Sequence, residues 1–104
     1  MELDGFTFDS QKEARRYSEL KLLVRVGQIS ALELQKSFVL AESVKFNNEP
    51  RAKPAIRYVA DFAYMENGVM IVEDVKSKAT KALPVYRIKK HLMKNVHGIE
   101  IQEI

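Results

Sequence analysis

The chain has 104 residues, of which 46 % are hydrophobic and 30 % are charged, and it contains no cysteine. This length predicts a single domain over residues 1–104 with one core, and the lack of cysteine excludes disulfides and thiolate metal sites. The first residues include the acidic Glu2 and Asp4 rather than an apolar segment, and no apolar run reaches membrane-spanning length. We therefore expect a cytoplasmic protein that does not insert into a membrane.

The order of hydrophobic patterns predicts helices that alternate with strands. Ser10 and Glu13 have the spacing of a capping box, which predicts a helix from Gln11 to about Arg25. Three strands and a second helix then follow at Gln35–Phe46, Ile56–Met65, Val69–Val75 and Pro84–Asn95, before a last short strand at Ile99–Ile101. The order α-β-β-β-α-β predicts an α/β (α+β mixed) fold in which helices flank a central mixed sheet.

The apolar side chains predict which faces are buried. In the second helix they recur at helical spacing and predict an inward stripe of Val85, Ile88, Leu92 and Val96. On the hairpin, alternation places Tyr58 and Phe62 on one face and Val59 and Ala63 on the other. Because both faces are apolar, helices, or one helix and a partner subunit, are expected to cover them.

Asn67-Gly68 is a strong signal for a two-residue hairpin turn. If these are the turn residues, counting outward from them places Asp61 directly opposite Asp74. A longer turn with a bulge would instead place Asp61 opposite Glu73. In the two-residue case Glu73 has the opposite parity and lies outside the site.

Two directly opposed carboxylates repel each other, so the pairing of Asp61 with Asp74 predicts a functional role. Their Cβ atoms would be about 5 Å apart, and their repulsion costs about 3 kcal/mol at an effective dielectric constant near 20. A hard cation such as Mg²⁺ between Asp61 and Asp74 reverses the sign of this interaction. Lys76, two residues beyond Asp74, projects from the same face. A metal ion can polarise a phosphodiester and acidify a bound water, and an ammonium group can stabilise developing charge, so the pattern predicts phosphodiester hydrolysis.

Glu13 is a third acid with two possible roles. It completes the capping box with Ser10, yet helical phase places it within the apolar stripe of Ala14, Tyr17 and Leu20, facing the sheet. We expect Glu13 to reach the metal or its water, with a helix cap as the alternative.

The region from Val75 to Ile99 is strongly basic. It contains seven Lys or Arg residues and no Asp or Glu, the seven being Lys76, Lys78, Lys81, Arg87, Lys89, Lys90 and Lys94. Such a one-signed segment predicts a polyanion-binding surface. The alternative is a solvated helix face.

Asp61 followed by Asp74-Val75-Lys76 resembles the signature of the PD-(D/E)XK nuclease superfamily, although Ala60 stands where the signature has proline. The fuller combination resembles a phage and prophage family catalogued as a domain of unknown function and similar to Holliday junction resolvases. It consists of Ser10-x-x-Glu13-Ala14-x-x-Tyr17-x-x-Leu20, Leu32-Glu33-Leu34-Gln35, Tyr58-x-Ala60-Asp61-Phe62-x-Tyr64, Glu73-Asp74-Val75-Lys76 and Tyr86-x-x-Lys89.

The resemblance implies a restriction-endonuclease-like fold and assigns roles to single residues. Asp61, Asp74, Glu13 and the carbonyl of Val75 would hold Mg²⁺, which Mn²⁺ could replace, and Lys76 would be the catalytic lysine. Asp61, Asp74, Lys76 and Glu13 would thus form the catalytic set. The resemblance also implies a homodimer acting on DNA, in the host cytoplasm if a phage encodes the chain. The role of Gln35 is left open.

The leading hypothesis is a metal-dependent DNA endonuclease acting on branched or recombination DNA. Phosphates would be held by the basic residues Lys78, Lys81, Arg87, Lys89, Lys90 and Lys94. One alternative is a phage nuclease that nicks or cuts duplex DNA during packaging or host exclusion. Another, of a different class, is a non-catalytic nucleic-acid-binding module.

Overall fold

The computed structural model describes residues 2–76 and 78–104, with the side chain of Lys78 outside the described part. The elements in chain order are β1 (Glu2–Leu3), β2 (Phe6–Thr7), α1 (Gln11–Arg25), β3 (Ser30–Ala41), β4 (Ile56–Glu66), β5 (Val69–Asp74), α2 (Lys78–Lys81), α3 (Pro84–His97) and β6 (Gln102–Glu103). No helix among the described residues combines the length and the apolar character needed to cross a membrane.

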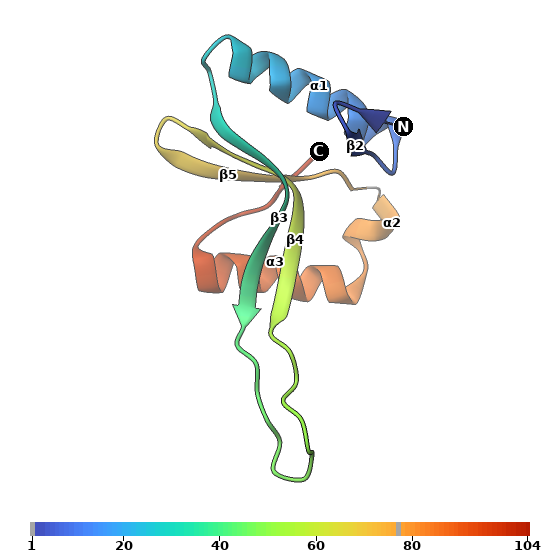
Figure 1. The fold of residues 1–104 in the computed structure, drawn as a ribbon, viewed down its shortest axis with the longest axis vertical. Helices are drawn as coiled ribbons and strands as arrows, with labels where there is room; N and C mark the ends of the chain where they lie inside the picture. Colours follow the sequence, from blue (N-terminus) through green and yellow to red (C-terminus); the bar gives the residue numbers. More distant parts are fainter. Residues whose placement is uncertain (1, 77) are drawn as a thin grey trace.

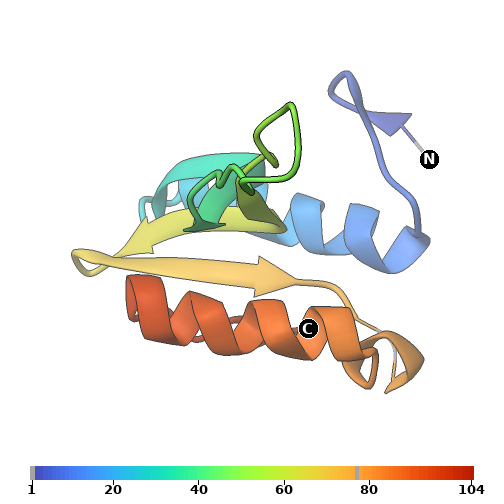
Figure 2. The same cartoon turned by 90° about the horizontal axis from the view of Figure 1, so that it is seen from below.

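The sheet is mixed and helices lie on both sides of it. Its strands follow the order β3-β4-β5-β6, with antiparallel pairs up to β5 and a parallel pair between β5 and β6, while β1 and β2 form a separate ribbon. Helix α1 packs on one side and α3 on the other (Figures 1 and 2). The predicted α+β mixed fold is therefore confirmed, and the observed order adds the β1–β2 ribbon and α2 to the predicted one.

Helix α1 has the bounds expected from its capping residue. The Ser10 Oγ accepts a hydrogen bond from the Glu13 N–H at 3.1 Å, which satisfies a free donor of the first turn. Ala14, Tyr17 and Leu20 are buried in a cluster with Phe62 of β4. This packing fixes α1 across the sheet, and its first turn therefore meets the site described below.

The β4–β5 hairpin has the predicted two-residue turn. Asn67 and Gly68 have φ angles of 52° and 78°, as a type I′ turn requires. Facing pairs include Met65 with Met70, Ala63 with Val72 and Phe62 with Glu73. The bulged alternative is thus excluded, and Asp61 and Asp74 are the next positions along the two strands.

The faces of β3 and β4 exchange near Asp61, which the simple alternation did not predict. Tyr58 belongs to the core cluster under α3, whereas Phe62, of the same parity, belongs to the cluster under α1. On β3 the buried Phe38 lies under α3, whereas Leu34 packs under α1.

The switch occurs at two facing positions. Gln35 has a φ of 54°, in the left-handed region, and the regular pairs on either side of it are Lys36 with Ala60 and Leu34 with Phe62. Gln35 and Asp61 lie between those pairs. The predicted shared face for Tyr58 and Phe62 was therefore wrong, because the left-handed residue turns both strands over.

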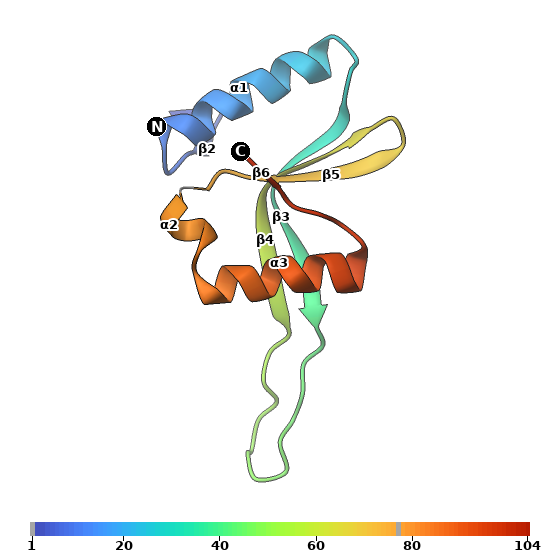
Figure 3. The same cartoon turned by 180° about the vertical axis from the view of Figure 1, so that it is seen from behind.

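The connection between β3 and β4 is a projecting arm rather than a strand extension. The predicted strand Gln35–Phe46 is shifted, since β3 covers Ser30–Ala41. Residues 42–55 form a long arm that leaves the body of the molecule beyond α3 (Figures 1 and 3). It is braced by a bridge between Val44 and Lys53.

The last strand is also shifted, since it covers Gln102–Glu103, later than the predicted Ile99–Ile101.

Helix α3 faces the sheet with a different side from the one predicted. Tyr86 and Met93, seven residues apart and therefore on one face, are buried. The predicted inward residues Val85, Ile88 and Val96 are 65 %, 60 % and 49 % exposed, and only Leu92 packs partly against the core. The stripe prediction was wrong because two adjacent faces of α3 are both apolar, and helical periodicity does not choose between them.

Candidate active site

The predicted acids and the lysine meet at one cleft beside the first turn of α1 and the end of β5. The cleft has a volume of about 470 Å³ and is lined by Asp9, Ser10, Lys12, Glu13, Asp61, Val75, Lys76 and Thr80. Asp74 adjoins this cleft and is only 2 % exposed. The fold therefore brings together Glu13, Asp61, Asp74 and Lys76 from three separate parts of the chain.

The two aspartates form a strained electrostatic pair. Burial, reinforced by the nearby Asp61 carboxylate, raises the pKa of Asp74 to about 7. Opposing this effect, the Tyr58 hydroxyl donates a hydrogen bond to Oδ2 of Asp74. Asp61 is held from the other side, because the Val75 backbone N–H donates to its Oδ2 at 2.8 Å. Each carboxylate is thus fixed in place while the pair remains unfavourable when both members are charged.

Lys76 is positioned by an acid and an aromatic ring. Its Nζ lies 3.4 Å from Oδ2 of Asp74 and 4.8 Å from the centroid of the Tyr86 ring. A cation over an aromatic face is attracted to it, so the ring steadies the ammonium group. The Tyr86 hydroxyl in turn donates to Oε2 of Glu103 at 2.6 Å. The lysine therefore remains partly accessible from the cleft but cannot swing freely.

Two tyrosines of this site, Tyr58 and Tyr86, were not assigned a role from the sequence. Both hydroxyls are bonded to carboxylates near the site, at Asp74 and Glu103 respectively. For Tyr58 the available signal was a tyrosine, rather than a phenylalanine, on an apolar face of the predicted hairpin, whereas Tyr86 lay outside the predicted inward stripe and gave no such signal. A buried tyrosine usually has a polar partner for its hydroxyl.

Glu13 takes part in the helix cap and also lies beside the aspartates. Its backbone N–H takes part in the helix cap, while its side chain is only 8 % exposed and lies toward the aspartates. Burial raises the pKa of Glu13, and the carboxylates of Asp61 and Asp9 raise it further. Glu13 is therefore electrostatically coupled to Asp61 across the cleft.

A buried ion pair joins α1 to β5 beside the site. Arg16 donates from Nε and Nη2 to the two carboxylate oxygens of Glu73 at 2.7 and 2.6 Å, and the Tyr64 hydroxyl donates to the same carboxylate at 2.5 Å. Glu73 is 2 % exposed. This bidentate contact links the helix that carries Glu13 to the strand that carries Asp74, although Glu73 itself points away from the cleft. Sequence patterns could not find it, because Arg16 and Glu73 are far apart in the chain.

The residues of the cleft fit a hard divalent cation by their chemistry. Such a cation takes carboxylate oxygens, and it relieves the repulsion that raises the pKa of Asp74. Within residues 2–76 and 78–104, however, no three acidic, histidine or cysteine side chains converge closely enough to hold a metal by themselves. The fit is therefore to Mg²⁺ held by one or two carboxylates, with water and a phosphate completing its shell, the usual arrangement for this ion.

The predicted basic surface is present but is less uniform than expected. Four of its cations line a groove of about 580 Å³ beside the C-terminal segment, namely Lys81, Arg87, Lys90 and Lys94. Lys89 is half-buried and does not line this groove, and the side chain of Lys78 lies outside the described part. The prediction of a surface with positive charge only was wrong in one respect, because two acids of the C-terminal segment, Glu100 and Glu103, also line this groove.

Comparison with known proteins identifies a family without assigning an activity. The model of a family described as "Protein of unknown function (DUF1064)" matches residues 1–102. The comparisons give no match among curated proteins and none among solved structures.

Proposed function

We propose that this chain, which belongs to the DUF1064 family of proteins of unknown function, is a divalent-metal-dependent DNA endonuclease. The observation that carries the proposal is the Asp61–Asp74 pair beside Lys76. Burial, together with the nearby Asp61 carboxylate, raises the pKa of Asp74 to about 7, which is unfavourable for folding and is typical of functional sites. A structural sheet gains nothing from such a pair, whereas a bound cation turns it into a favourable arrangement.

Each residue has a role in hydrolysis that follows from its surroundings. Asp61 and Asp74 would hold Mg²⁺ or Mn²⁺, with Glu13 and the carbonyl of Val75 as further oxygen donors. The bound metal would supply Lewis-acid polarisation of the scissile phosphodiester and a more acidic water. Lys76 stands 3.4 Å from Asp74 and would stabilise the charge that develops on the phosphate oxygens.

The substrate is proposed from two separate sources. The lysines and arginine of the groove favour a nucleic acid backbone over a small phosphate ester, because they extend well beyond the cleft. The choice of branched or recombination DNA rests on the resemblance to Holliday junction resolvases. Phage packaging or host exclusion, with nicking or cutting of duplex DNA, is the alternative within the same chemistry.

The test is a cleavage assay with purified protein. Labelled four-way junction, flap and duplex DNA are incubated with Mg²⁺, with Mn²⁺ and with EDTA. We expect metal-dependent cleavage, and a loss of about 10²-fold or more for Lys76→Met, as for other groups that stabilise developing charge. Glu66→Gln, at an exposed residue beside the hairpin turn, is the control and should retain most of the activity. Failure of the wild type to cut any of the substrates with either metal contradicts the proposal.

A non-catalytic nucleic-acid-binding module is the competing function. It is favoured by the fact that Asp74 already has protein partners, Tyr58 and Lys76. The two functions differ in metal binding. If Mn²⁺ titrated into the wild type gives no calorimetric signal, while labelled DNA still binds, the module hypothesis is preferred.

The homodimer and the cytoplasmic location are also proposals. The exposed Val85, Ile88 and Val96 on α3 offer apolar surface for a second copy, and cutting two strands symmetrically favours a two-fold pair. Sedimentation of the wild type and of Ile88→Glu tests this. A monomeric wild type at micromolar concentration contradicts the dimer and leaves the chemistry of the site untouched.

A further inference from the structure

We infer that the groove between α3 and the C-terminal segment is a binding site for a nucleic acid backbone, and that Glu100 and Glu103 occupy its cations until phosphates displace them. The inference rests on the DNA partner of the proposed function and extends it. It defines the surface that holds the strand and adds an internal competitor for that surface.

The groove is lined both by cations and by two acids of the C-terminal segment. Lys90 Nζ lies 3.2 Å from Oε2 of Glu103, and Lys94 Nζ lies 3.6 Å from Oε1 of Glu100. Carboxylates at ion-pair distance neutralise these ammonium groups, as phosphates neutralise lysines in protein–DNA contacts. The two acids therefore resemble, in charge, the ligand that the groove would bind.

The position of Glu103 is set by the sheet rather than by the lysine. Strand β6 pairs in parallel with β5 so that Glu103 is next to Asp74, and the Ile104 N–H donates to the Asp74 carbonyl at 2.9 Å. The Tyr86 hydroxyl also holds the Glu103 carboxylate. Because Glu103 is anchored independently, Lys90 can leave it without loss of the fold. Displacement by a phosphate thus requires only rotation of an exposed lysine side chain.

The groove is next to the candidate active site. The ring face of Tyr86 contacts Lys76 of the cleft, and the Tyr86 hydroxyl donates to Glu103 of the groove. A single side chain therefore contacts both the cleft and the groove. Helix α2 connects them along the chain, since Thr80 lines the cleft and Lys81 lines the groove. A strand lying along the groove would therefore lead directly to the acids of the cleft.

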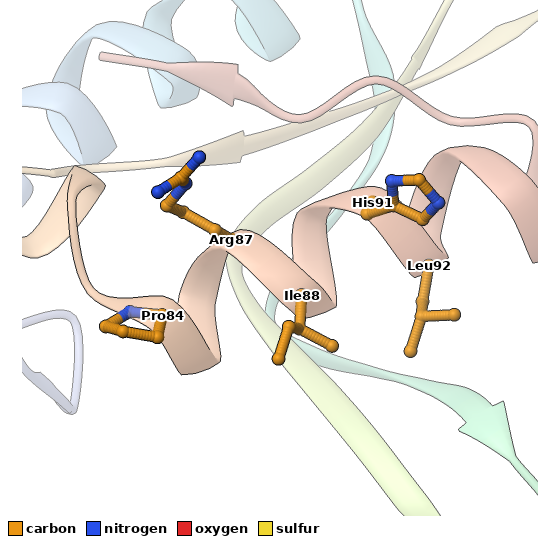
Figure 4. A pocket seen from close by; sticks show the side chains of 5 residues that line it. All are labelled: Pro84, Arg87, Ile88, His91 and Leu92. Carbon is orange, nitrogen blue, oxygen red and sulfur yellow. The ribbon is translucent and has the colours of Figure 1, made fainter.

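The two sides of α3 differ in chemistry, which favours a polyanion on the groove side. Arg87 and His91 extend from the side nearer the C-terminal segment, whereas Pro84, Ile88 and Leu92 extend from the other side (Figure 4). The apolar side has no groups that select phosphate. The side that faces Glu100 and Glu103 carries the positive charge, and its charge is complementary to a nucleic acid backbone.

The test measures DNA binding with the two acids neutralised. The double variant Glu100→Gln/Glu103→Gln keeps an oxygen acceptor for the Tyr86 hydroxyl while removing the competing charges. Binding to fluorescein-labelled duplex and single-stranded oligonucleotides is followed by anisotropy in EDTA, which prevents cleavage. We expect binding about three- to tenfold tighter than wild type at low salt, the range for two ion pairs whose lysines are exposed, with the difference shrinking as salt is added.

A matched control separates this mechanism from a general gain of positive charge. Glu33 and Glu49 form comparable pairs with Lys36 and Lys53 outside the groove, at 3.0 and 3.4 Å. The double variant Glu33→Gln/Glu49→Gln therefore changes the net charge by the same amount and also releases two lysines. It should bind no more than about twofold tighter than wild type.

The possible outcomes distinguish this inference from the proposed function. Equal DNA affinity of wild type and Glu100→Gln/Glu103→Gln overturns the inference. An equal gain of DNA affinity in the control variant also overturns it. Neither outcome affects the cleavage result. A gain confined to the groove variant, with no cleavage of any DNA, supports the inference and contradicts the nuclease. Should the double variant fail to fold, Glu100→Gln alone, at a side chain 74 % exposed, is expected to give about a twofold gain. Lack of DNA binding by all variants overturns both.

Discussion

Replacing Asp74 by asparagine should stabilise the metal-free protein, by an amount that depends on pH. Burial and the Asp61 carboxylate raise the pKa of Asp74 from 3.8 to about 7 in the folded protein. Asparagine has nearly the same shape, carries no charge and can still accept the hydrogen bond from Tyr58. The substitution therefore removes the unfavourable charge and leaves the packing almost unchanged.

The size and sign of the effect follow from linkage. Between pH 4 and 7 the folded protein holds a proton on Asp74 that the unfolded chain has lost, so the free energy of unfolding falls as pH rises through this range. The difference in pKa corresponds to about 4 kcal/mol, an upper limit because the charge is shared with Asp61. We expect Asp74→Asn to match the wild type near pH 4 and to exceed it by about 2–4 kcal/mol at pH 8.

The measurement is urea denaturation in EDTA at several pH values. Glu66→Gln, which removes an exposed acid beside the hairpin turn, serves as the control and should follow the wild-type pH profile. Addition of Mg²⁺ should reverse the order of stability at pH 8, because only the wild type retains both carboxylates for the cation. Parallel pH profiles for wild type and Asp74→Asn would show that the aspartate pair is not strained, which contradicts a cation site at this pair.

Two further substitutions test the residues that support the site. Glu73→Gln leaves the partly buried guanidinium of Arg16 without a full partner and should lower the free energy of unfolding by about 2–4 kcal/mol. By contrast, Glu19→Gln breaks the exposed pair of the same arginine and should change the free energy of unfolding by less than about 1 kcal/mol in urea titrations. Tyr58→Phe removes the hydrogen bond that lowers the pKa of Asp74. Calorimetric titration of this variant should therefore find weaker Mg²⁺ binding at pH 7, with the affinity partly restored at pH 8.5. Equal affinities at both pH values argue against this role of Tyr58.

Local signals predicted the elements that carry the site. The capping residue Ser10 predicted where α1 begins, and Asn67-Gly68 predicted the turn and hence the partner of every residue up to Phe62. These signals act over a few residues, where backbone conformation is decided by the residues themselves. The proximity of Asp61 to Asp74 followed from this register alone.

Contacts between distant parts of the chain could not be predicted in the same way. The inward face of α3 is set by Tyr86 and Met93, whose positions depend on what the sheet offers to each apolar side of the helix. Glu100 and Glu103 fold back onto Lys94 and Lys90 only because β6 joins the sheet beside β5. Periodicity identifies an amphipathic helix, whereas the choice between two apolar faces is made by tertiary packing.

The left-handed residue Gln35 explains why the acids meet at this point of the sheet. It lies opposite Asp61, and both strands exchange their buried faces there, so that β3 and β4 pack under α3 at one end and under α1 at the other. A residue at such a switch lies between the two cores. Asp61 can therefore approach Glu13 of α1 on one side and Asp74 on the other. A left-handed φ is unfavourable for glutamine but not for glycine, so Gln35→Gly should preserve the switch, whereas Gln35→Val should destabilise it and separate the acids of the cleft.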